Sequence, residues 1–114
     1  NRKQSYHAFL STLEAIKTGS SIVVFPEGTR SEDGSIGVFK KGSQLLAQRA
    51  KVPMVPVTIV GTRDIIRKGS MLFHPGTVRI IISPCIALEE KDAKKGDEIL
   101  QEIRNIICKN FKTT

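Results

Sequence analysis

Three short apolar runs, rich in β-branched residues, constrain the fold of this chain more than any other feature. They lie at Ile22–Phe25, Val55–Val60 and Thr77–Ser83, and Pro26 and Pro84 end the first and the last of them. Continuous apolar runs of this length are typical of strands that are covered on both faces, as in a parallel sheet. We therefore expect a mostly parallel sheet at the centre of the fold.

Apolar residues at helical spacing surround these runs. They recur at helical intervals within Ser5–Thr18, and Gly19 is suited to ending that helix. The segment Gly42–Ala50 suits a second helix closed by Pro53, and the apolar positions from Ile99 to Phe111 predict a final amphipathic helix. The order helix, strand, helix, strand, strand, helix predicts a layered α/β fold.

The remaining stretches are polar or basic. Glu27–Gly37 is rich in turn residues and predicts a loop, Thr62–Gly76 is a basic connection, and Lys91–Asp97 is expected to be a solvated linker. A length of 114 residues with 39% hydrophobic residues fits one globular domain, without internal repeats. The chain begins at Asn1 without a methionine and turns helical almost at once, so we expect it to start inside a larger domain.

The balance of charge narrows the possible partners. Eighteen Lys and Arg residues against eleven Asp and Glu residues give a net charge of +7, which favours nucleic acid, anionic lipid or phosphorylated metabolites. Aromatic residues are scarce and no nucleic-acid-binding motif is present, so we predict no nucleic-acid partner. Cys85 and Cys108 have no metal-ligand spacing and predict free thiols, with no metal site. Runs such as Val55–Gly61 are shorter than the roughly 20 residues of a membrane span, so membrane contact would be peripheral.

The segment that follows the first apolar run carries the chemistry. It reads Phe-Pro-Glu-Gly-Thr-Arg-Ser from Phe25 to Ser31, and a loop at the end of a parallel strand is where open α/β sheets bind ligands. Gly28 allows close approach to a ligand, while hydroxyls and the Arg30 guanidinium match phosphate oxygens. Glu27 would orient Arg30 or accept a hydrogen bond from a substrate hydroxyl. From the residues alone, an ordinary polar turn remains an open interpretation.

The same segment resembles a conserved block of a known enzyme family. Phe25–Ser31 matches, residue for residue, the F-P-E-G-T-R-S block of the 1-acylglycerol-3-phosphate acyltransferases, which are glycerolipid acyltransferases. Phe39–Gly42 resembles the family's F-K-x-G element, and Val55–Val57 resembles its V-P-V block, in the same order and at similar spacing. The proline of that block, Pro56, predicts an edge position or a bulge near the site.

The resemblance implies a site for the phosphate of the acceptor. It assigns this role to the block Glu27, Gly28, Thr29 and Arg30. We add Ser31, whose hydroxyl is a donor, and Lys40 and Lys41, which precede the predicted helix at Gly42 where amides and ammonium groups can face an anion. For either lysine alone, a solvated basic turn is an equally good interpretation.

The family's catalytic block, H-x-x-x-x-D, is absent from this sequence. At the fifth position after His7 stands Thr12, and at the fifth position after His74 stands Arg79, so neither histidine has the aspartate partner of a general base. We therefore predict no catalytic residue here, and interpret residues 1–114 as the C-terminal part of a single acyltransferase domain that is inactive alone. Its incomplete sheet should expose an apolar face or edge and favour self-association.

The resemblance implies transfer of a fatty acyl group to a lysophosphatidic-acid-like acceptor. The donor would be a thioester co-substrate, acyl-CoA or acyl carrier protein, with no other cofactor, and the enzyme would work at the cytoplasmic face of a membrane. The alternative is a non-catalytic basic module that binds anionic lipid surfaces or phosphorylated ligands through Arg63, Arg67, Lys68 and Lys40.

Overall fold

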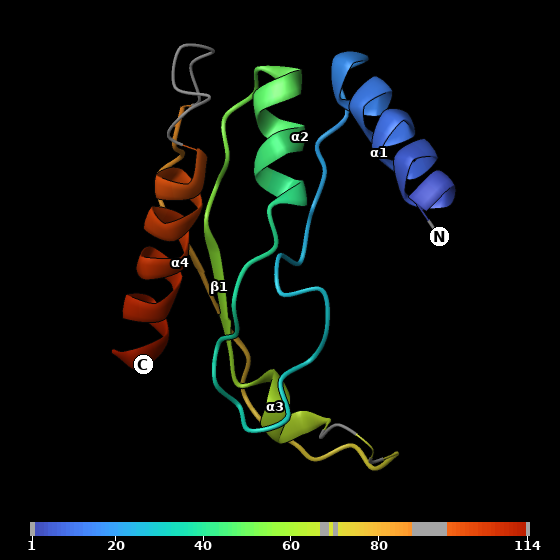
Figure 1. The fold of residues 1–114 in the computed structure, drawn as a ribbon. Coiled ribbons are helices and arrows are strands. Elements are labelled where there is room, and N and C mark those ends of the chain that lie inside the picture. The colour runs from blue at the N-terminus through green and yellow to red at the C-terminus, as the bar shows by residue number, and fades with distance from the viewer. Residues whose placement is uncertain (1, 67–68, 70, 88–95, 114) are drawn as a thin grey trace.

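The computed structural model describes residues 2–66, 69, 71–87 and 96–113. Its elements, in chain order, are α1 (Arg2–Lys17), α2 (Gly42–Ala50), β1 (Val57–Val60), α3 (Thr62–Ile65), β2 (Arg79–Ile82) and α4 (Gly96–Lys112) (Figure 1). The three predicted helices are confirmed, while the short helix α3 lies in a stretch that we expected to be only a connection. Residues 96 and 97 of the predicted linker belong to α4, and its residues 91–95 lie outside the described residues.

The sheet differs from the prediction. β1 and β2 pair antiparallel, with Val57 opposite Ile82 and Val60 opposite Arg79, so the expected mostly parallel sheet is wrong. Two parallel neighbours need a crossover, usually a helix that returns the chain to its starting end. Among the described residues of the connection, the four-residue helix α3 is the only helix, and the chain comes back along β1 in the opposite direction.

The first predicted strand is not paired. Residues 20–25 are extended, but they belong to neither described strand, and Val23 and Phe25 are 81% and 75% exposed. In Figure 1 this segment descends on one side of α2, whereas the chain that leads from α2 into β1 descends on the other. An apolar, β-branched sequence favours an extended backbone, but a strand also needs a neighbour for its hydrogen bonds. The prediction of a buried strand at Ile22–Phe25 is therefore wrong for the described residues.

β1 is buried on one face only. Thr58 is 1% exposed, whereas Val57 and Ile59 on either side are 41% and 39% exposed, so our expectation of burial along the whole run is wrong. The Thr58 hydroxyl meets a partner inside, because Asn110 Nδ2 donates to Thr58 Oγ1 at 3.4 Å. Pro56 is fully buried just before the strand, where its missing N–H costs no ladder bond, and its carbonyl accepts from the Ser83 N–H at 3.0 Å.

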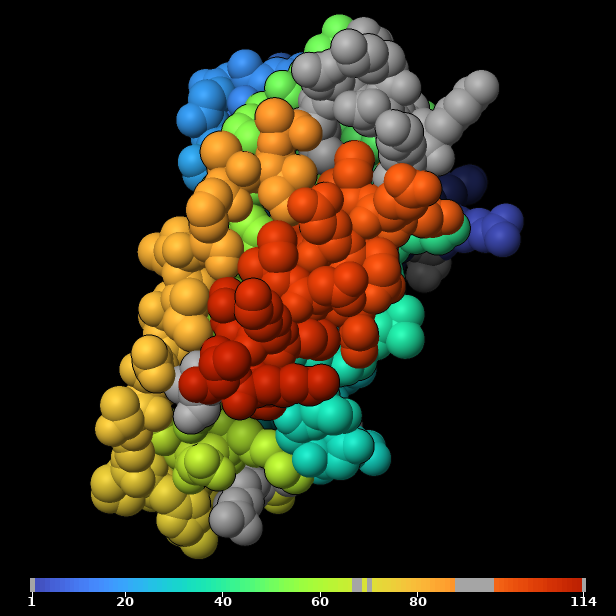
Figure 2. Space-filling model, turned by 90° about the vertical axis from the view of Figure 1, so that its left-hand side faces the viewer, coloured from blue at the N-terminus to red at the C-terminus, as the bar shows by residue number. Residues whose placement is uncertain are grey.

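The core lies between α4 and the chain that leads into α2. Its buried residues are Phe39, Leu100 and Ile103, and five half-buried residues pack against them: Ile36, Met54, Ile86, Ile99 and Ile107. α1 packs on α2, and α2 and β1 pack on α4. Figure 2 shows residues 77–87 along one flank of α4 and the residues around position 35 along the other. The helix α4 therefore joins the sheet to the loop that precedes α2.

An apolar groove of about 400 Å³ opens between the extended segment 20–24, α2, residues 52–57 and α4. Together with the exposed side chains of Val23, Phe25 and Ile80, it confirms that the chain exposes an apolar face. Cys85 and Cys108 are free thiols, as predicted. Among the described residues, no helix is both long and apolar enough to cross a bilayer.

Candidate functional site

The candidate site is the loop that runs from Pro26 to Lys40. Its two ends are joined, because the backbone N–H of Lys40 donates to the carbonyl of Pro26 at 2.8 Å. Beside this bond the chain makes a tight turn, in which the Gly28 N–H donates to the Phe25 carbonyl at 3.0 Å. Phe39, buried in the core, fixes the end of the loop. A loop with joined ends holds its polar side chains on a defined frame.

Gly28 and Lys40 lie together at this closed end. Gly28 has a φ of 74°, a left-handed conformation that residues with a Cβ rarely adopt. A Cβ atom at this position would lie 2.8 Å from Lys40 Nζ and 3.0 Å from Lys40 Cε. The lysine side chain therefore crosses the bare face of the glycine. Within the described part of the chain the Lys40 ammonium has no anionic partner, so a cation stands beside the backbone of the loop.

Glu27 is part of the frame of the loop. Its Oε2 accepts a hydrogen bond from the Gly37 N–H at 2.9 Å. This bond connects the outgoing limb of the loop, which holds Glu27, with the returning limb, which holds Gly37. We expected Glu27 to orient Arg30 or to contact substrate. Instead, the Arg30 guanidinium donates from Nη2 to the Ile66 carbonyl at 2.6 Å, so the first of these expectations is wrong.

Thr29 and Arg30 are the exposed polar residues of the block. The bond to Ile66 engages one of the five N–H donors of Arg30, so others remain to bind an anion. The Thr29 hydroxyl makes no hydrogen bond to any described residue. Thr29, Arg30 and Lys40 thus have hydrogen-bond donors that are not used by other described residues and could bind a ligand.

Ser31 belongs to a compact turn at the tip of the loop. Its Oγ donates to Asp33 Oδ1 at 3.0 Å and accepts from the Gly34 N–H at 2.8 Å. The side chain and the backbone N–H of Ser35 also donate to Asp33, at 2.6 and 2.9 Å. These bonds, with those from Ser35 first, lower the pKa of Asp33 from its ordinary 3.8 to about 2. The Ser31 hydroxyl is therefore used within the loop.

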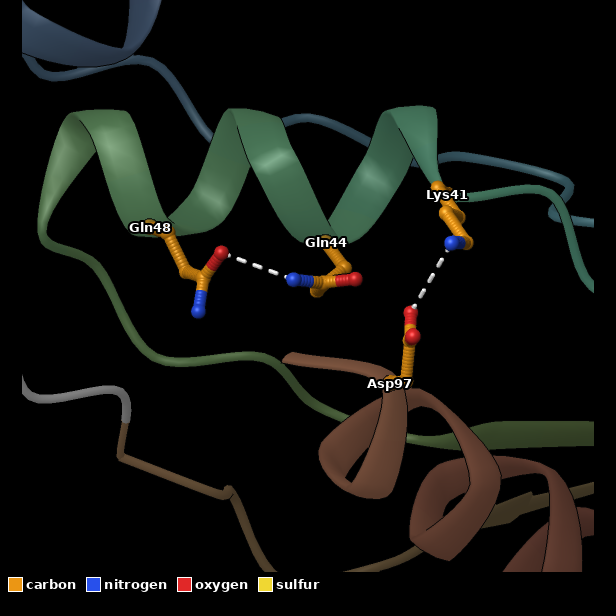
Figure 3. A network of polar contacts seen from close by, with 4 residues as sticks. All are labelled: Lys41, Gln44, Gln48 and Asp97. Atoms are coloured by element: carbon orange, nitrogen blue, oxygen red, sulfur yellow. Dashed lines mark hydrogen bonds and ion pairs between the residues drawn. The ribbon is translucent and has the colours of Figure 1, made fainter. Parts of the chain in front are cut away.

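The two predicted lysines have different neighbours. Whereas Lys40 lies beside Gly28, the Lys41 ammonium lies 3.3 Å from Asp97 Oδ1 at the first turn of α4 (Figure 3). Both side chains are mostly exposed, so this ion pair contributes little to stability. Figure 3 also shows Gln44 donating to Gln48 along α2, beside the pair. Lys41 therefore points at α4, and Lys40 is the lysine that the structure brings to the loop.

A family model described as Acyltransferase matches residues 1–60, which include this loop, the segment Phe39–Gly42 and Val55–Val57. The chain belongs to the acyltransferase family. The resemblance seen in the motifs is thereby confirmed.

Similar proteins refine this assignment. A chloroplastic 1-acyl-sn-glycerol-3-phosphate acyltransferase of Brassica napus is 41% identical over 100 residues, which cover 87% of this chain and 28% of that protein. One from Borreliella burgdorferi is 33% identical over 117 residues, covering 99% of this chain and 46% of the relative. The crystal structure of the lysophosphatidic acid acyltransferase PlsC from Thermotoga maritima matches with a TM-score of 0.82 and 35% identity, over 90% of this chain and 42% of PlsC. The chain thus spans less than half the length of these relatives.

Neither histidine of this acyltransferase chain lies in the loop. His7 is exposed on α1, and His74 is an exposed residue of the connection between α3 and β2, where its backbone N–H donates to the Ile65 carbonyl at 2.8 Å. A basic residue of α3 does contact the loop. Arg63, which we had assigned to a membrane-binding face, donates from Nη1 and Nη2 to the backbone carbonyls of Asp33 and Glu32.

Sequence reasoning missed one further residue of the acyltransferase loop. Arg104 of α4 donates from Nε to the Gly37 carbonyl and from Nη2 to the Ile36 carbonyl, each at 2.9 Å. It lies far from the loop in sequence, within an amphipathic helix where a lone arginine indicates only a polar face. No local signal identifies it, because the contact exists only once α4 has packed on the core.

Proposed function

We propose that the protein containing this chain transfers a fatty acyl group from a thioester to the hydroxyl of a lysophosphatidic-acid-like acceptor. The loop from Pro26 to Lys40 would hold the phosphate of that acceptor. The observation that carries the proposal is the Lys40 ammonium beside the bare face of Gly28, both within the residues that the family model matches. The relatives are themselves named 1-acyl-sn-glycerol-3-phosphate acyltransferases, which supports this choice of acceptor.

The phosphate would be held by donors of three kinds. The Lys40 ammonium supplies a compact positive charge, Arg30 supplies its remaining N–H groups, and Thr29 supplies a hydroxyl. Charge-assisted bonds of this kind are about twice as strong as neutral ones. The Glu27 carboxylate would repel phosphate at contact distance, and its bond to Gly37 gives it a structural role. Ser31 would contribute indirectly, by its hydrogen bonds within the tip of the loop. Lys41 would contribute indirectly, from its position at the start of α2.

Binding the phosphate would align the acceptor hydroxyl for reaction. A general base, supplied by a His that precedes an Asp at the family spacing, would take the hydroxyl proton, and the oxygen would attack the thioester carbonyl. The carbon–sulfur bond then breaks, and the thiolate leaves and takes up a proton. Since these 114 residues hold no such pair, we expect this chain alone to give no turnover above background.

The donor and the setting are part of the proposal. We propose acyl-CoA or acyl carrier protein as the thioester, and work at the cytoplasmic face of a membrane, where an amphiphilic acceptor resides. The net charge of +7 supports attraction to anionic lipid surfaces. The alternative of a purely basic surface module is less well supported. Arg63 is bound to carbonyls of the loop, and Arg67 and Lys68 lie outside the described residues.

The test replaces Arg30 by Ala in the protein that contains this chain. Losing one or two charge-assisted bonds of about 1.5–3 kcal/mol each should raise the acceptor KM at least about tenfold. Arg49→Ala, an exposed position on α2, is the matched control because it removes the same charge. Unchanged acceptor affinity and turnover in Arg30→Ala would refute the phosphate site. A steep loss of binding with salt in both variants alike would favour the surface module.

A further inference from the structure

We propose that Arg63 and Arg104, two arginines outside the F-P-E-G-T-R-S block, are positioning residues that set the shape of the phosphate-binding loop. This inference rests on the proposed function of the loop. Each guanidinium donates two hydrogen bonds to carbonyls of consecutive residues, so that two carbonyls at the tip of the loop and two on its returning limb are bound from outside the loop.

The backbone of Arg104 is held in place by the packing of the core. The preceding residue, Ile103, is 5% exposed and packs with Phe39 and Leu100, so the backbone of α4 is immobilised at this point. From there the planar guanidinium reaches the Ile36 and Gly37 carbonyls, and Figure 2 shows this part of the chain lying along the flank of α4. A planar donor pair on two acceptors fixes direction as well as distance. The returning limb is thereby tied to the hydrophobic core.

Arg63 holds the tip of the loop. It donates from Nη2 to the Glu32 carbonyl at 2.8 Å and from Nη1 to the Asp33 carbonyl at 3.1 Å. Gly34 makes room for it, because a Cβ at this position would lie 2.6 Å from Arg63 Nη1. Its φ of 85° is again one that favours glycine. The tip is therefore built to receive a guanidinium group.

Gly37 connects Arg104 to the proposed anion site. This residue is bound on both sides, by Arg104 at its carbonyl and by Glu27 at its N–H. Glu27 directly precedes Gly28, whose bare face lies against Lys40. Three contacts thus connect α4 to the cation: Arg104 with Gly37, Gly37 with Glu27, and Gly28 with Lys40. Without Arg104 the Gly37 peptide is free to turn, and Glu27 loses its fixed partner.

The substitution Arg104→Lys separates this role from a simple effect of charge. Lysine keeps the positive charge but cannot bind two carbonyls with a rigid pair of donors. We expect amide hydrogen exchange at Gly37 and Lys40 to become about tenfold faster in the protein that contains this chain, and the KM for lysophosphatidic acid to rise about five- to tenfold. The kcat and the KM for the thioester donor should stay the same. Arg49→Lys on α2 is the control and should change none of these quantities.

Unchanged exchange at Gly37 and unchanged acceptor KM in Arg104→Lys, with Arg30→Ala still impaired, would overturn the positioning role. If Arg30→Ala has no effect, the proposed phosphate site fails, while the exchange rates still decide whether Arg104 orders the loop. If Arg104→Lys does not fold, Arg63→Lys serves instead, because its side chain lies on the surface of the short helix α3. Equal effects in Arg63→Lys and Arg49→Lys would likewise overturn the proposal.

Discussion

Replacing Gly28 by Ala should damage the site more than the fold. The new residue must adopt a φ of 74°, which costs about 1–2 kcal/mol for a residue with a Cβ. Its Cβ would also lie 2.8 Å from Lys40 Nζ and 3.2 Å from Lys40 Cδ, so the flexible lysine side chain must move away. We expect a modest loss of stability and the loss of the ammonium from its place beside the loop.

The effect on binding can be estimated separately. If the displaced ammonium loses one charge-assisted bond to phosphate, about 1.5–3 kcal/mol disappears from the acceptor binding energy. This corresponds to a Kd for lysophosphatidic acid that is about tenfold to a hundredfold higher. Isothermal titration calorimetry on the protein that contains this chain measures it directly, and a urea unfolding curve gives the stability of the same variant.

Gly19→Ala is a matched control for the backbone. Gly19 has a φ of 103° and no neighbouring atom within 4 Å of a Cβ, so the variant has comparable strain without touching a lysine. The double variant Gly28→Ala/Lys40→Ala should bind no more weakly than Lys40→Ala alone, because the alanine then has no ammonium to displace. If Gly28→Ala weakens acceptor binding no more than Gly19→Ala does, the contact between Gly28 and Lys40 has no part in binding.

Three further predictions concern the carboxylate, the core and the exposed face. Since hydrogen bonds lower the pKa of Asp33 to about 2, its contribution to the stability of the loop should be fully present above about pH 4 and be lost as the pH falls through 2. An NMR titration should show the lowered pKa of Asp33, and Ser35→Ala should raise that pKa. An unshifted pKa of Asp33 in the parent chain would contradict the prediction. In urea unfolding, Phe39→Ala should lower the free energy of unfolding by about 3–5 kcal/mol, whereas Lys41→Ala should change it by less than about 1 kcal/mol. Equal losses of unfolding free energy in the two variants would be inconsistent with the described core. The chain alone should self-associate through its exposed apolar residues, and Phe25→Asp should weaken this in light scattering. A monodisperse monomer over a wide range of concentration would speak against it.

The helices were predictable because a helix satisfies its own backbone. Apolar spacing identified α1, α2 and α4 to within a few residues, and the bounds of α2 agree at both ends. A strand depends on a neighbour that the local sequence does not name. The runs Val55–Val60 and Thr77–Ser83 each contain a strand, yet their antiparallel pairing follows from a connection whose short helix we did not predict.

The candidate site was predictable to a similar degree. The block from Glu27 to Arg30 and the lysines at 40 and 41 could be named from short motifs, because the residues are adjacent. Which lysine lies beside Gly28 depends on the bond between the Lys40 N–H and Pro26, which no pattern of residue types encodes. Arg63 and Arg104 reach the loop only through the packing of α3 and α4, so the local sequence does not indicate that either residue contacts the loop.

The joined ends of the loop also bear on how related enzymes diverge. Because the bond between Lys40 and Pro26 holds the ends together, residues added at the tip near Ser31 leave Gly28 and Lys40 in place. The entropy of closing a loop grows only with the logarithm of its length, by about 0.6 kcal/mol for each doubling. The bond that joins the ends should therefore let related chains differ in the length of the tip while Gly28 and Lys40 stay side by side.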